Sequence, residues 1–303
     1  MNALTIETNH LNFSFRNGQK ILDDLSLAVP AGSIYGFLGP NGAGKTTTIR
    51  LLLGLLSNQS GTIRLFGQDF VKNRITLLQR LGSLIETPSI YTHLTGLENL
   101  EIFRLSYDCE KKRIGEVLEL VGLTQAAHKK AKAYSLGMKQ RLAIAISLLH
   151  APELLILDEP TNGLDPTGII ETRELIKSLN RESGTTILVS SHMLAEVEKM
   201  ATHVGIINKG KLLFQGPLSE LQQLKSKTSA VELEVDDTTR ARLLLQDQFP
   251  LKAVNGTRIQ VAFESRERCA VINHLLITGG VQVYQMAITQ NDLENLFIQI
   301  TTE

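Results

Sequence analysis

The residues most able to do chemistry form the segment GPNGAGKTT, residues 39–47. It matches the pattern G-x-x-x-x-G-K-[ST], follows an apolar run at 33–39 that we expect to be a strand, and opens an expected helix at 45–56. Glycines let consecutive backbone N–H groups turn toward phosphate oxygens, and the helix N-terminus adds a favourable dipole. In this pattern the lysine reaches the β- and γ-phosphates and the threonine hydroxyl binds Mg²⁺. The motif predicts a nucleoside triphosphate site with Mg²⁺, formed by Gly39, Pro40, Asn41, Gly42, Ala43, Gly44, Lys45, Thr46 and Thr47.

Two adjacent carboxylates supply the second half of this chemistry. The segment LLILDEP, residues 154–160, is an apolar run that ends in Asp158 and Glu159. In nucleotide hydrolases a carboxylate at the end of such a strand lies beside the phosphate loop, where Mg²⁺ binds. We therefore expect Asp158 to ligate Mg²⁺ together with Thr46, and Glu159 to polarise the attacking water. Adjacent acidic residues can also simply begin a helix, but the apolar strand and the phosphate loop favour hydrolysis.

Strands and helices alternate around these motifs. The apolar runs at 154–158 and 185–191 are bounded by turns, which is typical of buried strands in a parallel sheet. The other expected elements are helices at 167–181 and 193–200, a mostly helical stretch at 95–150 and a hairpin within 203–216. This alternation indicates the α/β fold class.

The character of the sequence changes after Pro217. A polar, helical stretch at 219–228 is typical of a linker, and residues 229–303 predict a small second unit with the order β-α-β-β-α-β and a last helix at 291–300. This order is found in ferredoxin-like folds, so we expect a small α+β domain there. Its role stays open between binding a regulator and strengthening a dimer.

The composition favours neither a nucleic-acid partner nor a membrane-spanning chain. The 303 residues include 31 basic and 31 acidic side chains, so no basic face for nucleic acid is indicated. The N-terminal residues lack the pattern of a secretory signal, and the longest apolar stretch, 142–160, is interrupted by His150, Pro152 and Glu153. Two distant cysteines are too few for a disulfide framework or a zinc site. We therefore expect a soluble protein of a reducing compartment.

The order of the motifs resembles that of the ATP-binding cassette (ABC) ATPases, over residues 1 to about 218. After the phosphate loop come YSLGMKQR at 134–141, LLILDEP at 154–160, NGLD at 162–165 and SSH at 190–192. The resemblance implies a P-loop NTPase of the ABC type with a helical subdomain at about 88–150.

In this resemblance YSLGMKQR is the family's signature. Ser135 and Gly137 match it, whereas Leu136 and Lys139 depart from its commonest form. A serine at a helix start can turn its hydroxyl and nearby N–H groups toward an anion. The resemblance implies that this helix faces the γ-phosphate of ATP held by a second subunit. One chain carries one phosphate loop and one signature, so a second copy is expected to complete the site.

Three further positions are carried over from the family's motifs. Asp165 in NGLD resembles the aspartate that links the two sites across the dimer. His192 in SSHML resembles the histidine that contacts the γ-phosphate, although a single histidine after a strand is more often structural. Phe15 lies where the family has an aromatic side chain that stacks on adenine. Phe13 is an alternative for that role, and Phe15 could instead be a half-buried strand residue.

One departure from the family pattern falls at Glu86. The family has a glutamine at the end of the strand that follows the helix near 74–81, whereas LGSLIETPSIY offers Glu86 there. A carboxylate could ligate Mg²⁺ or its water, and more strongly than an amide. We therefore expect Glu86 to act on the metal side of catalysis and to link the state of ATP to a membrane partner. Two segments resemble ATPases of bacterial exporters of drugs and of peptide antibiotics such as bacitracin and lantibiotics. They are IETPSIYTHLTGLENL and the C-terminal DLENLFIQIT.

The resemblance implies the ATPase subunit of an ABC transporter, most closely a drug or peptide-antibiotic exporter. It would form a pair, most simply with itself, and drive separate transmembrane permease subunits. We expect it in the cytoplasm, peripheral on the cytoplasmic face of the cell membrane, docked through a face near Glu86–Leu100.

One alternative is a soluble ABC ATPase of DNA repair or translation. Long coiled coils between the motifs or a second cassette would favour this alternative, and the sequence contains neither. The other alternative is the ATPase of an importer. The two segments that resemble exporter ATPases argue against it, but only by resemblance.

Overall fold

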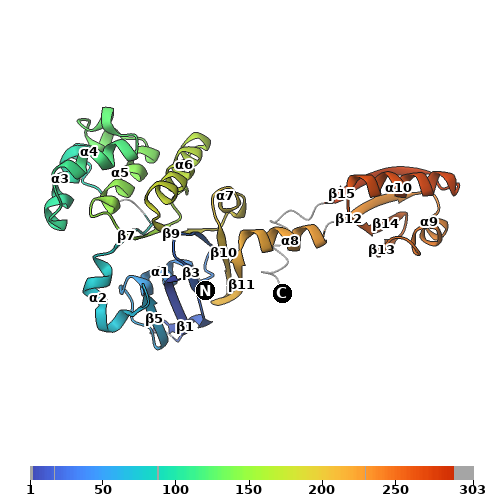
Figure 1. Cartoon of the computed structure of the whole chain (residues 1–303), viewed down its shortest axis with the longest axis horizontal. Helices are drawn as coiled ribbons and strands as arrows, with labels where there is room; N and C mark the ends of the chain where they lie inside the picture. The colour runs from blue at the N-terminus through green and yellow to red at the C-terminus, as the bar shows by residue number, and fades with distance from the viewer. Residues whose placement is uncertain (1–2, 17, 87–88, 229, 290–303) are drawn as a thin grey trace. The chain divides into compact units, whose positions relative to one another are not determined.

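A six-stranded sheet carries the predicted motifs in the first of two units, Met1–Leu218 and Ser219–Glu303. The computed structural model describes residues 3–16, 18–86, 89–228 and 230–289 (Figure 1). The strands are β4 (Ile34–Leu38), β7 (Leu81–Leu84), β8 (Leu154–Asp158), β9 (Thr186–Ser191), β10 (His203–Asn208) and β11 (Lys211–Pro217). Their order is β11-β10-β4-β9-β8-β7. β11 pairs antiparallel with β10 and the other neighbours pair in parallel, which confirms the α/β prediction.

A second, antiparallel sheet belongs to the same unit. It consists of β1 (Leu4–Ser14), β2 (Lys20–Leu25), β3 (Ala28–Pro30), β5 (Ser60–Leu65) and β6 (Gln68–Asp69). Of this sheet the sequence predicts only part of β1, through the alternation in LNFSF, residues 11–15. The reason is irregular alternation: β2 buries Leu22 and Leu25 with two residues between them, and its pairing with β1 contains register shifts. A strand of period two is therefore not visible in that segment.

The core of this unit joins both sheets through α1 (Lys45–Leu52). Ile49 and Leu52 of α1 are buried in one cluster with Ile6 of the antiparallel sheet and Ile156 of the parallel sheet. The helix ends four residues before the predicted residue 56, because the chain turns at Gly54, whose φ of 65° is left-handed. The phosphate loop thus stands at the start of a helix that is fixed by packing on two sides.

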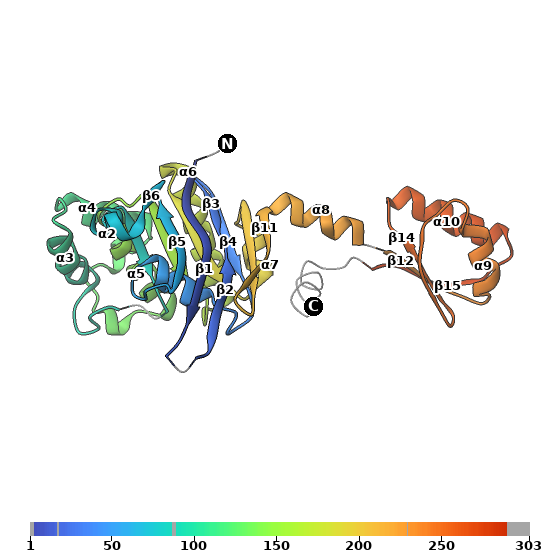
Figure 2. The same cartoon turned by 90° about the horizontal axis from the view of Figure 1, so that it is seen from below.

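The helical subdomain contains α3 (Gly96–Tyr107), α4 (Lys112–Leu120) and α5 (Leu136–Leu148), which gather at one end of the unit in both views (Figures 1 and 2). Its first helix begins with a capping box, in which Thr95 and Glu98 satisfy each other's backbone N–H groups. The amide of Asn99 is fully buried and bonds to the backbone of Tyr91 and Thr95. These contacts fix the loop that precedes the subdomain.

Three more helices complete the unit. They are α2 (Phe70–Leu78), α6 (Pro166–Ser183) and α7 (Leu194–Glu198). α6 begins with Asp165 as its N-cap and ends at Gly184, whose φ of 65° suits a helix terminus. α7 is shorter than the expected helix at 193–200. Among the residues that the structure describes, no helix has the length and apolar character needed to cross a membrane.

The second unit contains α8 (Leu218–Thr228), of which Leu218 belongs to the first unit, followed by a four-stranded antiparallel sheet. The other elements are β12 (Ala230–Val235), α9 (Thr238–Leu245), β13 (Leu251–Asn255), β14 (Arg258–Ala262), α10 (Arg266–Thr278) and β15 (Val283–Thr289). The order in the sheet is β13-β14-β12-β15. Val231 and Leu233 of the sheet share a buried core with Leu245 and Ile272 of the helices. The helix expected at 291–300 lies outside the described residues.

We predict that Ile156→Ala lowers the free energy of unfolding of the first unit by about 3 kcal/mol, because Ile156 is fully buried in the middle of β8. The matched control is Ile170→Ala on α6, where the side chain is half exposed and a change within about 0.5 kcal/mol is expected. Urea unfolding of the full chain, followed by far-UV circular dichroism, gives both values. Equal losses in the two variants would contradict the assigned core.

Candidate active site

The phosphate loop has the backbone shape that its sequence predicts. Gly42 and Gly44 have φ values of 81° and 113°, which are left-handed and favour glycine. A Cβ at Gly44 would come within 2.7 Å of the Leu22 side chain, and one at Gly39 within 2.4 Å of the carbonyl oxygen of Ile207. Gly42 is therefore favoured by its conformation, Gly39 by the lack of space for a Cβ, and Gly44 by both. The loop leads directly into α1, so backbone N–H groups at the helix start are available for an anion.

Lys45 places a buried positive charge at this loop. Its side chain donates to the carbonyl oxygen of Gly39 at 2.7 Å, and its ammonium nitrogen lies 3.3 Å from a carboxylate oxygen of Glu159. Only 6% of the residue is exposed. A buried ammonium group with a fixed direction is suited to bind phosphate oxygens.

Asp158 lies at the centre of a small set of oxygen atoms. Thr46 donates from its hydroxyl to Asp158 Oδ2 at 2.8 Å, and Ser190 donates to the other carboxylate oxygen. Asp158 is 1% exposed. Both of these side chains contact it through their hydroxyl groups. A hard divalent cation such as Mg²⁺ prefers a carboxylate and a hydroxyl among its ligands, so this donor set fits the predicted metal.

Glu159 and His192 form a second pair beside the first. The imidazole Nδ1 of His192 lies 2.9 Å from Glu159 Oε2, while the other carboxylate oxygen faces Lys45. Glu159 has a left-handed φ of 49°, which is strained for a residue with a side chain. Its backbone N–H donates to Ser190 Oγ at 2.9 Å and so holds this conformation. The result is a carboxylate fixed between two nitrogen groups at the rim of the phosphate loop.

A cavity of about 480 Å³ opens over these residues. It is lined by Phe15, Gln19, Ile21, Asn41, Gly42, Gly44, Lys45, Thr46, Thr47, Glu159, Asn162 and His192. Phe15 is 41% exposed at this cavity, whereas Phe13 is 7% exposed and packs edge-on against Phe15 with ring centroids 5.2 Å apart. Of the two phenylalanines, Phe15 is the one with a ring face available to a ligand.

The signature residues lie elsewhere. Ser135 is the N-cap of α5, and its hydroxyl accepts from the backbone N–H of Met138 at 3.2 Å. Ser135 is exposed, and a Cβ at Gly137 would meet nothing closer than 3.9 Å among the described atoms. Asp165 caps α6 by accepting from Gly168 N–H at 3.1 Å. None of these three is among the described residues that line the nucleotide cavity, so within one chain they are not part of it.

Glu86 has a different partner from the predicted one. It follows β7, has a left-handed φ of 57° and forms an ion pair with Arg50 of α1. Its side chain is 57% exposed. The described contacts of its carboxylate do not include Thr46 or Asp158. A role at the metal would require Glu86 to leave Arg50, and it stays a prediction.

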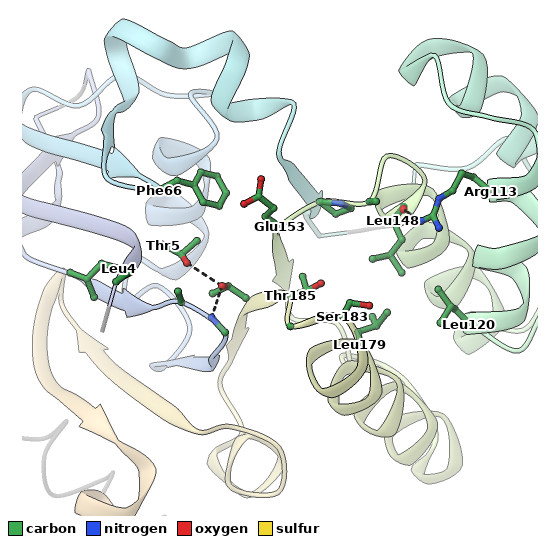
Figure 3. Close-up of a pocket in the computed structure, with 17 residues that line it drawn as sticks. Leu4, Thr5, Phe66, Arg113, Leu120, Leu148, Glu153, Leu179, Ser183 and Thr185 are labelled. Atoms are coloured by element: carbon green, nitrogen blue, oxygen red, sulfur yellow. Dashed lines mark hydrogen bonds between the residues drawn. The ribbon is translucent and has the colours of Figure 1, made fainter. Parts of the chain in front are cut away.

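A second cavity, of about 580 Å³, lies at the opposite edge of the parallel sheet (Figure 3). Its lining includes Thr5, Phe66, Arg113, Glu153 and Thr185, with Thr5 and Thr186 joined by a hydrogen bond of 3.1 Å between their hydroxyls. Glu153 directly precedes β8 and Thr185 directly precedes β9, whereas Asp158 is the last residue of β8. The cavity in Figure 3 is therefore separate from the phosphate chemistry.

Ser190 is the main site residue that the sequence did not predict. Its hydroxyl bonds to both Asp158 and the backbone of Glu159, and it is fully buried. The motif SSH was recognised for His192 alone, because a serine inside an apolar strand gives no sign of its partners. Gln19, Ile21 and Asn162 of the cavity lining were also missed, since no motif contains the first two and NGLD was used only for Asp165.

We predict that Ser190→Ala lowers the rate of ATP hydrolysis about 10- to 100-fold, the usual cost of removing a group that orients a metal ligand. Ser191→Ala is the matched control, because the neighbouring serine is equally buried but bonds to the backbone of Met193 instead. Steady-state phosphate release measures both. Equal effects of the two substitutions would contradict the orienting role of Ser190.

Comparison with known proteins agrees with this geometry. The family model described as ABC transporter matches residues 22–162, and a model of an AAA domain matches residues 129–198. The bacitracin transport ATP-binding protein of Bacillus licheniformis is 45% identical over 285 residues, which cover 93% of this chain and 92% of that protein. The lantibiotic transport ATP-binding protein of Streptococcus pyogenes is 44% identical over 195 residues, 64% of this chain and 83% of that protein.

Solved structures give the same answer for the fold. A subunit of an ABC transporter complex from Clostridium perfringens superposes with a TM-score of 0.69 at 26% identity, over 74% of this chain and 92% of that chain. The expected P-loop fold of the ABC type is therefore confirmed. The chain belongs to the family of ABC transporter ATP-binding proteins, which are ATPases coupled to transport.

Proposed function

We propose that this chain hydrolyses ATP at the cluster of Lys45, Asp158, Glu159 and His192 in order to drive an exporter. The observation that carries the proposal is the fixed carboxylate of Glu159, held within 2.9 Å of His192 and 3.3 Å of Lys45 beside the phosphate loop. Glu159 polarises the attacking water, and His192 holds the carboxylate in place and contacts the γ-phosphate. Lys45 binds the β- and γ-phosphates, and the ring of Phe15 stacks on the adenine.

Thr46 and Asp158 are the residues that would hold Mg²⁺ on the bound nucleotide. When present, Mg²⁺ neutralises charge that develops on the phosphates during transfer. Ser190 keeps the Asp158 carboxylate in position through its hydroxyl. The same hydroxyl accepts from the N–H of Glu159, so the metal side and the water side of the site are set by one serine.

The active form is a head-to-tail pair of identical chains. Ser135 and Gly137 are exposed or partly exposed on α5 and are absent from the described lining of their own chain's cavity. A helix start that carries an exposed serine and an uncrowded glycine is suited to approach the γ-phosphate of ATP held by a partner. Asp165 then links the two sites. ATP binding closes the pair, and hydrolysis opens it again.

A membrane-embedded permease receives this motion. The predicted docking face around Glu86–Leu100 continues along α3 (Gly96–Tyr107). Tyr91, which precedes this helix, exposes 47% of its surface, and Ile102 and Leu105 on the helix expose 40% and 64%. Exposed apolar groups close together are typical of protein interfaces. The chain thus works at the cytoplasmic face of the membrane through separate permease subunits.

The cargo class is a drug or a peptide antibiotic. This part of the proposal is supported by the relatives whose names specify bacitracin and lantibiotic transport, with identities of 45% and 44%. They favour export over an importer or a soluble ABC ATPase. Glu86 is proposed as the residue that reports the nucleotide state to the permease, through release or formation of its ion pair with Arg50.

We predict that Glu159→Gln retains ATP binding but lowers hydrolysis about 10²- to 10⁴-fold, because the amide cannot accept a proton from water. A stable ATP-bound dimer is expected by size-exclusion chromatography with light scattering. Glu153→Gln is the control, since Glu153 precedes β8 at its other end and pairs with Arg80. Near-normal turnover in Glu159→Gln would show that another residue polarises the water.

We predict that Glu86→Ala reduces ATP-driven transport in membrane vesicles about 10-fold, as loss of a group that orients a site residue does. Glu86→Gln keeps the length of the side chain but removes the ion pair with Arg50, so it is expected to reduce transport as well. Transport and ATPase rates are measured for both variants with the permease present. If Glu86→Ala leaves both rates unchanged, Glu86 has no part in coupling.

A further inference from the structure

The helix that follows His192 is too short to hold its own position. His192 comes directly after β9, which ends at Ser191, and α7 (Leu194–Glu198) begins two residues later. α7 has five residues, and its N-cap, Met193, makes no side-chain hydrogen bond that would cap the helix. A helix of this length is not stable without tertiary packing. The position of His192 therefore depends on what holds α7.

One attachment of α7 is its contact with the backbone of β4. Leu194 and Val197 of α7 are both buried. A Cβ at Gly36 of β4 would come within 2.1 Å of Val197 Cγ1, so the helix packs where that strand has no side chain. The strand that leads into the phosphate loop is thus in direct contact with the helix that follows His192.

Glu196 forms the second attachment of α7. It is an acidic residue, yet only 8% of it is exposed. Its carboxylate Oε2 lies 3.7 Å from Nη1 of Arg173 on α6, and the two side chains are only 10% and 14% exposed. The other carboxylate oxygen lies 3.5 Å from Nζ of Lys199, whose side chain is 55% exposed. Because solvent weakens the pair with Lys199, Arg173 is the main cation that holds Glu196.

Stability alone does not account for this ion pair. Among the residues that the structure describes, Glu196 Oε2 has no hydrogen-bond partner. A buried oxygen without a hydrogen bond costs free energy, and apolar residues in place of a buried ion pair are often neutral or stabilising. The pair does join α7 to a helix with a fixed position, because Leu175, Ile176 and Leu179 of α6 are buried. Arg173 therefore anchors the short helix to a long one.

We propose that Arg173 and Glu196 are positioning residues for His192. Their ion pair fixes α7 against α6 and so holds the imidazole of His192 at its distance of 2.9 Å from Glu159. This role rests on the proposed function, in which His192 contacts the γ-phosphate. Neither Arg173 nor Glu196 is among the described residues that line the nucleotide cavity, so both act through His192.

Loss of the ion pair should slow hydrolysis without weakening the binding of ADP. Glu196→Gln keeps the size of the side chain and removes its charge. We expect it to lower kcat about 10-fold, because a small displacement of a group in the site is enough for such a loss. The affinity for ADP should stay unchanged, since ADP has no γ-phosphate, whereas the affinity for the β,γ-imido analogue of ATP should fall. Arg181→Gln is the matched control, because it removes an exposed arginine from the same helix and should leave kcat unchanged.

A double-mutant cycle with His192 separates positioning from a purely structural role. His192→Ala should lower kcat, and adding Glu196→Gln to it should cause no further loss, because the side chain that the pair positions is gone. Arg173→Gln is a second variant of the same pair and should behave as Glu196→Gln does in both backgrounds. Release of labelled phosphate from ATP measures each rate, and urea unfolding of the full chain shows which variants are folded in the assay.

The cycle also distinguishes a failure of the positioning role from a failure of the proposed function. Losses from Glu196→Gln and His192→Ala that multiply in the double variant would overturn the positioning role alone. Normal kcat in both Glu196→Gln and Arg173→Gln would overturn it as well. If His192→Ala itself leaves kcat unchanged, the positioning role and the proposed contact of His192 with the γ-phosphate are both wrong.

Discussion

The structure of the site depends on the position of one buried carboxylate. Asp158 ends β8, accepts from Thr46 at the start of α1, and accepts from Ser190 on β9. The sheet order β4-β9-β8 places β9 between the strand that leads into the phosphate loop and the strand that ends in Asp158. Three segments far apart in the sequence therefore meet at one edge of the sheet. Ser190 also accepts a hydrogen bond from the backbone N–H of Glu159. The residue that positions the Asp158 carboxylate therefore also holds the strained backbone of Glu159, the proposed base.

Parts of the site formed by residues close together in the sequence could be predicted, whereas contacts between distant residues could not. The phosphate loop and the adjacent carboxylates were predictable, because their chemistry is encoded in consecutive residues. Ser190 was not, because its partners are set by which strands are neighbours. The antiparallel sheet was largely missed, since β2 lacks a regular alternation. The ion pair of Glu86 with Arg50 was also invisible, because the two residues belong to separate elements that only the fold brings together.

A single chain provides a site that is complete on one side only. The cavity over the phosphate loop gathers Lys45, Glu159, His192 and Phe15, whereas Ser135 stands exposed at the start of α5 and outside that lining. In the proposed pair, the signature of one chain closes the cavity of the other, so hydrolysis requires association. This arrangement lets a small change at the γ-phosphate become a movement of whole subunits. The ion pair joins Arg50, on the helix of the phosphate loop, to Glu86 at the start of the proposed permease face, where such a movement would be passed on.

The central claim is that this ATPase drives a partner in the membrane. The most direct measurement is purification of the tagged, full-length protein from detergent-solubilised membranes of the source cells, with identification of everything that co-purifies. We predict a polytopic membrane protein in a stoichiometric amount, and the genes beside its own would indicate the class of cargo. Recovery of ribosomes, nucleic acid or soluble proteins alone would contradict the transport function while leaving the ATPase chemistry intact.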